Sequence, residues 1–246
     1  MRRPFKVDLD KSSPPGQLRV ELSFARLAVE GERKNVGFTL ADFAGLGGSG
    51  ALGGGALDPA TTSIRTGPAT ISEHDAAQVF ADVCLSSASL TCLLNMMEWL
   101  HHRVLPLTAV RVSWDRIAEL KDPLAVQFPP PWPRLGYDLE LDDLEESFDI
   151  AVEFEAKKPP DLVEKIDEQL GLWYTAVNRG AYGNEALAPA DNAMYYTSDA
   201  VELAEDGITW FVDVFACDDS ALVGLENALE RVHRTIAPLR KVTISG

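Results

Sequence analysis

The sequence predicts an α+β fold built from two tandem ferredoxin-like repeats, each with an antiparallel sheet and the element order βαββαβ. Three observations lead to this prediction. A helix-and-strand segment occurs twice, 132 residues apart. Each half opens on a strand of alternating polarity, and each half has two extended segments before its second helix. A pseudo-twofold internal duplication would explain all three.

The repeated segment covers residues 88–113 and 220–245, which align without a gap. Its apolar residues follow the helical period, and a proline ends the helix before a strand. The identical pairs are Leu90/Leu222, Leu93/Leu225, Asn95/Asn227, Glu98/Glu230, His101/His233, Pro106/Pro238, Leu107/Leu239, Val110/Val242 and Ser113/Ser245.

In the first repeat, apolar and polar residues alternate over 17–25, which predicts a half-buried strand. A weaker helical pattern follows at 34–45. Extended segments at 63–72 and 77–85 come next, and then the repeated helix and strand.

In the second repeat, the alternating strand lies near 148–155. A clear amphipathic helix follows the prolines at 159–160. Two extended segments, 194–204 and 208–216, flank Asp206-Gly207, a pair typical of a hairpin turn.

A glycine-rich segment at 43–59 resembles residues 173–189 at a shift of 130. A phosphate-binding loop would follow a strand and precede a helix, whereas these glycines follow a helix. We therefore interpret them as helix termination and a flexible linker.

These patterns predict four segments: a flexible lead-in at 1–16, repeat one at 17–115, a linker at 116–147 and repeat two at 148–246. The linker is first proline-rich and then acidic. We expect it to act as a semi-rigid spacer, with Trp132 packed against a domain.

The net charge of −16 is uneven. Residues 1–115 hold 11 basic and 12 acidic residues, a net charge of −1, whereas residues 116–246 hold 11 and 26, a net charge of −15. Such a balance repels nucleic acid and suits either a solvated surface or a basic protein partner.

The three cysteines, Cys84, Cys92 and Cys217, have no disulfide or metal-ligand spacing. The first residues lack the apolar core of a signal peptide, and no apolar run reaches the roughly 20 residues of a membrane span. The sequence thus favours the cytoplasm and predicts no membrane partner.

Asn, Glu and His lie three residues apart on the repeated helix, as Glu98 with His101 and again as Glu230 with His233. Such a pair can perform acid–base catalysis. The helix also needs a polar side, however, and no nucleophile motif lies nearby. We expect a structural or inter-repeat role for both pairs.

No metal or cofactor is predicted. His101 and His102 are adjacent, so they diverge on a helix instead of sharing one metal. The acidic run 138–146 lacks the glycine and the ligand spacing of a calcium loop. No catalytic nucleophile motif occurs. An enzymatic role therefore has no positive support in the sequence.

The two repeats differ where Leu94 and Trp99 of the first meet Glu226 and Arg231 of the second. A helix that is apolar over a wide arc needs a second burial surface, in the other repeat, another copy or a partner. The sequence thus favours a non-enzymatic protein-binding module, in one version an immunity-like protein or an inhibitor that uses an acidic surface. The candidate binding residues are Leu94, Trp99, Trp132, Asp142, Asp143, Glu145 and Glu146.

The alternative is an enzyme or small-molecule binder with a cleft between the repeats. His101, His233, Trp173 and Tyr182 would line such a cleft, although core packing explains the aromatic residues as well. A homodimer also remains open.

Overall fold

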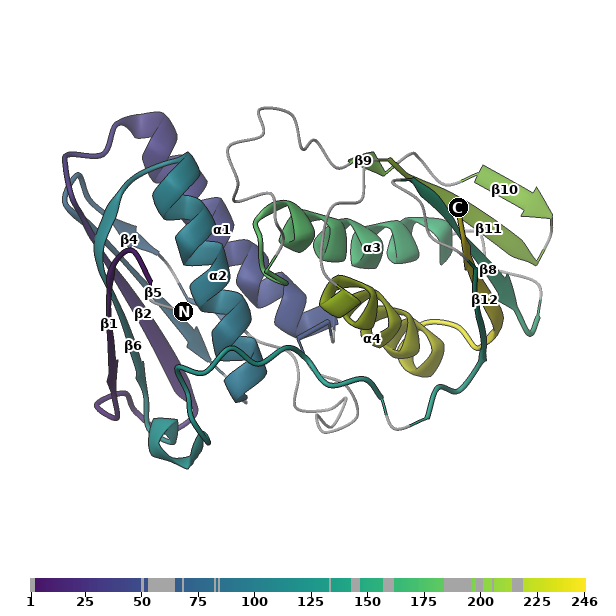
Figure 1. The fold of residues 1–246 in the computed structure, drawn as a ribbon, viewed down its shortest axis with the longest axis horizontal. Coiled ribbons are helices and arrows are strands. Elements are labelled where there is room, and N and C mark those ends of the chain that lie inside the picture. Colours follow the sequence, from purple (N-terminus) through teal and green to yellow (C-terminus); the bar gives the residue numbers. More distant parts are fainter. Residues whose placement is uncertain are drawn as a thin grey trace.

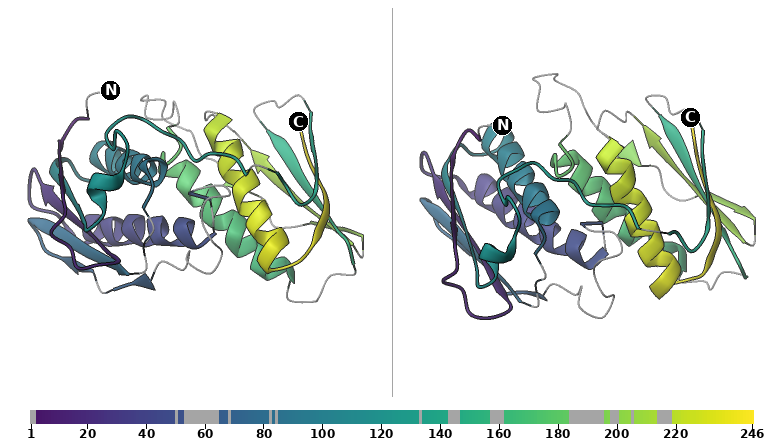
Figure 2. Two further views of the ribbon diagram at one scale, coloured as in Figure 1. Left: turned by 90° about the horizontal axis from the view of Figure 1, so that it is seen from below. Right: turned by 60° about the horizontal axis from the view of Figure 1, so that its bottom comes forward.

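The computed structural model has an α+β fold, and its described residues form two mixed sheets and four α-helices (Figure 1). The sheets lie at opposite ends of the molecule with the helices between them, as Figure 2 also shows. Each sheet therefore has one face against helices and one face toward solvent. The structure describes residues 3–49, 51–52, 65–67, 69–81, 83, 85–132, 134–142, 147–156, 162–183, 196–197, 201–204, 206–213 and 219–246.

The first sheet has the strand order β1-β6-β2-β5-β3, with β4 also paired to β5. Strand β2 runs antiparallel to both neighbours, whereas β1 runs parallel to β6. Two helices and a short 3-10 turn, η2, complete this half. The bounds are β1 Lys6–Asp10, β2 Gln17–Phe24, α1 Glu30–Ser49, β3 Arg65–Thr66, β4 Thr70–Ile71, β5 Asp75–Ala81, α2 Ser87–Arg103, β6 Leu107–Trp114 and η2 Ile117–Glu119.

The second sheet has the strand order β10-β11-β8-β12-β7, with β9 also paired to β11. Strand β8 is antiparallel to both neighbours, and β7 is parallel to β12. The bounds are β7 Asp138–Leu141, β8 Phe148–Phe154, α3 Leu162–Asn178, β9 Tyr196–Thr197, β10 Val201–Ala204, β11 Gly207–Asp213, α4 Asp219–Thr235 and β12 Leu239–Ser245.

The parallel strands β1 and β7 correct the prediction of purely antiparallel sheets. Strand β1 lies within the segment expected to be a flexible lead-in, and β7 lies within the predicted linker. Their registers match: Lys6 lies opposite Ala109, and Asp138 lies opposite Lys241, 132 residues further along in both strands. The sequence analysis missed both because each is short and has only two apolar residues.

Helix α1 is longer than the helix predicted at 34–45. It begins at Glu30 and continues to Ser49, so Gly45, Gly47 and Gly48 lie inside it. The prediction that these glycines terminate the helix is therefore wrong. An ideal Cβ at Gly45 would lie 2.5 Å from Leu172 of α3, which shows how closely the two helices approach.

Gly180, which aligns with Gly50 at the shift of 130, does follow the end of a helix. Gly180 has a φ of 66°. Its N–H donates to the carbonyl of Val177, and the Ala181 N–H donates to the carbonyl of Ala176. This is a Schellman motif, in which a residue with positive φ satisfies the last carbonyls of a helix.

The strand predicted at 17–25 is confirmed. Leu18, Val20 and Leu22 are buried against the helices, and the residues between them face outward. The same alternation appears in β8, where Phe148, Ile150, Val152 and Phe154 are buried. This period of two gives each sheet its apolar inner face and its polar outer face.

Replacing Gly180 by Ala should lower the free energy of unfolding by about 1–2 kcal/mol, because a Cβ at positive φ is strained. Urea denaturation measures this change. Gly171→Ala is the matched control, since Gly171 lies inside α3 with open space around it. That change should leave stability unaltered or raise it by up to about 1 kcal/mol. Equal effects of the two changes would contradict the assignment.

Candidate functional site

A charged cluster joins the two halves within the helix layer. Arg179, just after α3, lies 2.6 Å from a carboxylate oxygen of Asp42 in α1, an ion pair without hydrogen-bond alignment. Its guanidinium also donates to Thr39 Oγ1 at 2.6 Å and lies over the ring of Trp99 at 5.2 Å. Burial raises the pKa of Asp42, while Arg179 opposes that shift. The cluster thus connects α1 and α2 of the first half with the end of α3 in the second.

The additional apolar surface of α2 is thus partly covered by the other half, which is one of the three burial surfaces considered from the sequence. Trp99 is half-buried beneath Arg179. Asn95, on the same helix, donates to the carbonyl of Ala181 at 3.0 Å. Both contacts reach the turn that follows α3.

The aromatic residues assigned to an alternative cleft are packed inside. Trp173 is 1% exposed, and its indole N–H donates to the carbonyl of Ala221 at 2.8 Å. Tyr182 is fully buried, and its hydroxyl donates to the carbonyl of Ala51 at 3.4 Å. Tyr182 also lies so close to Gly224 that a Cβ there would overlap its ring. These two side chains therefore fill space within the helix layer.

The repeated glutamates anchor the chain just before each parallel edge strand. Glu98 pairs with Arg3, three residues before β1. Glu230 is fully buried; its carboxylate accepts the N–H of Gly136, two residues before β7, at 2.8 Å, and the Nε–H of Arg234 at 2.5 Å. Both carboxylates thus bind the chain segment that leads into an edge strand.

The repeated histidines hold the turn after each helix. Nδ1 of His101 accepts the N–H of Leu107, the first residue of β6, at 2.9 Å. Nδ1 of His233 accepts the N–H of Leu239, the first residue of β12, at 3.0 Å. An imidazole nitrogen that accepts a hydrogen bond carries no proton, so Nδ1 is the acceptor nitrogen of the ring in both contacts. These contacts support the structural role expected for both pairs.

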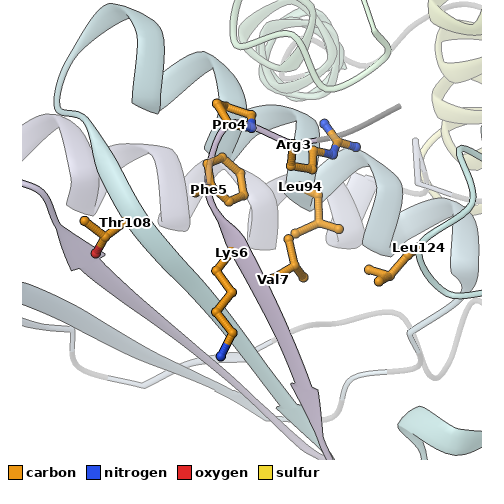
Figure 3. Close-up of a pocket in the computed structure, with 8 residues that line it drawn as sticks. All are labelled: Arg3, Pro4, Phe5, Lys6, Val7, Leu94, Thr108 and Leu124. Atoms are coloured by element: carbon orange, nitrogen blue, oxygen red, sulfur yellow. The ribbon is translucent and has the colours of Figure 1, made fainter.

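A cavity of about 670 Å³ runs along β1, at the end of the first sheet (Figure 3). Leu94 of α2 and Leu124 lie beside the strand, and Leu124 is 58% exposed. Leu94, predicted to be a binding residue, is itself only 2% exposed, so it forms the floor of the cavity. The remaining lining residues are Arg3, Pro4, Phe5, Lys6, Val7 and Thr108.

The residues that line this cavity differ between the halves, and two of the differences lie in the repeated helix-and-strand segment. Leu94 and Thr108 correspond to Glu226 and Arg240 at the shift of 132. Glu226 is half-buried, and burial raises the pKa of its carboxyl group. The cavity is thus built in part from residues that distinguish the first half from the second.

The second sheet has an acidic outer face, which we define by Asp138, Glu140, Asp149, Glu153 and Asp206, with Lys241 and Arg240 among them. Arg240 binds Glu153 at 2.7 Å and Asp206 at 3.3 Å, and Lys241 binds Glu140 at 2.7 Å. Five acidic and two basic groups leave a net charge of −3. The outer face of the first sheet carries Asp8, Asp10, Glu21 and Asp75 against Lys6, Arg19 and Arg111, a net charge of −1.

Phe211 of β11 lies on the acidic face and is 42% exposed. It is opposite Asp149 of β8 in the sheet register. Neither residue is predicted to belong to a site, because the alternation of polar and apolar residues along a strand shows only which side chains point outward. The net charge of −15 over residues 116–246 indicates that this part of the chain has an acidic surface, but not where on the fold that surface lies.

The remaining predicted binding residues fall in two groups. Trp132 is half-buried, and the guanidinium of Arg234 lies 4.2 Å from its ring centre, which agrees with the packing expected for the linker. Asp142 is exposed directly after β7 and extends the acidic face. Asp143, Glu145 and Glu146 lie outside the described residues, as do Cys84 and Cys217.

Within the described part of the chain, no group of three potential metal ligands comes together, and no helix is long and apolar enough to cross a membrane. Cys92 is fully buried, and burial raises the pKa of its thiol to about 12. A thiol so rarely ionised is a poor nucleophile. It packs as a small apolar side chain, as expected from the sequence.

The stability of the protein should fall between neutral pH and pH 5 through His101. Burial lowers the pKa of His101 in the folded state, the charge of His102 adds to that shift, and the charge of Glu98 opposes it. When folding lowers the pKa of a histidine, the neutral ring stabilises the folded state. This stabilisation is complete above the pKa of the unfolded chain and is lost as the pH falls through the pKa of the folded protein. Urea denaturation of the wild type and of His101→Asn, whose amide oxygen can still accept, measures the effect. The pH dependence of the variant should be weaker; identical pH profiles would contradict this role.

Comparison with known proteins leaves the family open. No protein-family model and no curated protein sequence matches the chain. Among solved structures, the periplasmic protease PqqL from Escherichia coli is 11% identical with a TM-score of 0.20, and the comparison covers 93% of this chain and 35% of that one. A conserved protein from Enterococcus faecalis V583 is 9% identical with a TM-score of 0.21, covering 91% and 76%. Likenesses this small assign neither a fold family nor a function.

Proposed function

We propose that this chain is a non-enzymatic protein-binding module whose acidic face binds a basic surface of another protein. The observation that carries the proposal is the concentration of exposed carboxylates on one open sheet face, around the partly exposed ring of Phe211. Interfaces commonly combine an aromatic residue with complementary charge around it.

The internal residues support a binding role over catalysis. Glu230, His101 and His233 bind backbone N–H groups, and Glu98 binds the side chain of Arg3. The helix layer between the halves is occupied by Trp173, Tyr182 and Arg179. An inhibitor or immunity-like protein needs a rigid, complementary surface instead of a reactive group. Charge complementarity would give such a protein rapid association.

We also infer that the two halves are ferredoxin-like repeats produced by duplication, each extended by one parallel strand. The equivalent histidines His101 and His233 bind equivalent backbone N–H groups, and β1 and β7 have equivalent registers. The equivalent glutamates Glu98 and Glu230 each bind the segment just before an edge strand, through the Arg3 side chain and the Gly136 N–H. On this view, the lead-in and the end of the linker belong to the repeats. The cytoplasm, with no nucleic acid or membrane as partner, remains the compartment that the composition favours.

The acidic face predicts a salt-dependent association with a basic partner. Capture from the native cell, followed by identification of the bound protein, supplies that partner for kinetic measurement. Reversing two charges, Glu140→Lys with Asp149→Lys, should slow association by about tenfold or more at low salt. High salt should slow the wild type by a similar factor.

The matched control reverses two charges on the open face of the first sheet, Glu21→Lys with Asp75→Lys, and should leave the association rate nearly unchanged. Circular dichroism establishes that each variant is folded. Association that is independent of salt, or equally slowed by both pairs of changes, would contradict the acidic face as the binding surface.

A further inference from the structure

We propose that a second copy of this chain binds along β1, so that the two β1 strands pair antiparallel across a twofold axis. Strand β1 ends the first sheet, and among the described residues it pairs only with β6. A strand at a sheet edge has unpaired backbone groups on one side and can accept another strand there.

The charges of β1 select one register. Lys6 and Asp8 point to the outer face, with side chains 72% and 42% exposed, and they form an ion pair with each other at 2.8 Å. When Val7 lies opposite Val7 of the copy, Lys6 of each chain faces Asp8 of the other. Both cross-strand pairs are then of opposite charge, which stabilises antiparallel strands.

Neighbouring registers are less favourable. Centring the pairing on Asp8 brings two carboxylates together; Lys6 would then face Asp10, whose carboxylate is already paired with Arg111. Centring it on Lys6 brings two ammonium groups together. Like charges directly opposite one another destabilise a strand pair. A twofold pairing centred on Val7 is therefore the one that the sequence of this strand favours.

The inner side of β1 suits the same register. Phe5, Val7 and Leu9 face the helices, and Val7 and Leu9 are only partly buried. In the proposed pairing, Val7 faces its own copy and Phe5 faces Leu9. The copy thereby extends the apolar side of the sheet along the cavity that Leu94 and Leu124 line.

Two exposed apolar residues follow the first half in the segment beside the strand. Leu124 and Val126 are 58% and 47% exposed, close in sequence and on the segment that passes the cavity. A five-residue strand alone falls short of the roughly 1,000 Å² that a stable interface buries. These two residues supply additional apolar surface for a copy to cover.

The corresponding edge of the second sheet opposes such pairing. Strand β7 has Asp138 and Glu140 on its outer face, and Asp142 follows directly. Every antiparallel pairing of β7 with its own copy brings carboxylates opposite one another. Charged side chains of one sign on an edge strand prevent edge-to-edge association, so the proposal selects β1 and excludes β7.

Sedimentation equilibrium of the full chain tests the proposal without any other protein, so its outcome is independent of the acidic-face binding proposed above. The wild type should reach twice the monomer mass as its concentration rises. Lys6→Asp and Asp8→Lys should each weaken dimerisation by about tenfold, because each turns two attractive cross-strand pairs into repulsive ones. The double variant should regain wild-type dimerisation, since it restores both pairs with their signs exchanged.

Arg19→Asp, the same charge reversal at an exposed position of the interior strand β2, is the matched control and should leave the mass distribution unchanged. Thermal unfolding followed by circular dichroism verifies that each variant is folded. A wild type that stays monomeric overturns the proposal. The free edge of β1 would then be available only to a strand of another protein. A dimer insensitive to the single changes, or a double variant that fails to recover, would overturn it equally.

Discussion

The contact between the helices of the two halves is the constraint on which the rest of the structure depends. Each sheet buries one face on two helices, and those helices must then cover their remaining apolar surface. Here they cover it with each other, through the close approach of α1 and α3 at Gly45 and Leu172 and through the cluster around Arg179. Both outer sheet faces are consequently left for solvent or partners.

This arrangement explains the contacts that the repeated polar residues make. Helices α2 and α4 each bury an apolar stripe in the core, and each is joined to the strand that follows it and contacts the segment that leads into an edge strand. Glu98 and Glu230 hold the chain that enters an edge strand, while His101 and His233 hold the chain that leaves the helix. Residues that satisfy buried backbone groups persist in both halves because losing them leaves those groups unpaired.

The sequence predicted the α+β class, the principal strands and three of the four helices well, because long periodic patterns determine them. It failed where the signal was short or ambiguous. Strands β1 and β7 have only two apolar residues each, and the glycines of α1 resemble those that end α3. The placement of Leu94 in a cavity and of Trp99 beneath Arg179 depends on contacts between distant segments. No local pattern contains that information.

Hydrogen exchange of the Asp42→Asn variant tests the shared helix layer most directly. Asp42 lies in the first half and Arg179 in the second. If the halves form one cooperative unit, the slowest amides of α1 and α2 and those of α3 and α4 should lose protection by the same free energy. Loss of protection confined to α1 and α2, with the slow amides of the second half unchanged, would contradict the account.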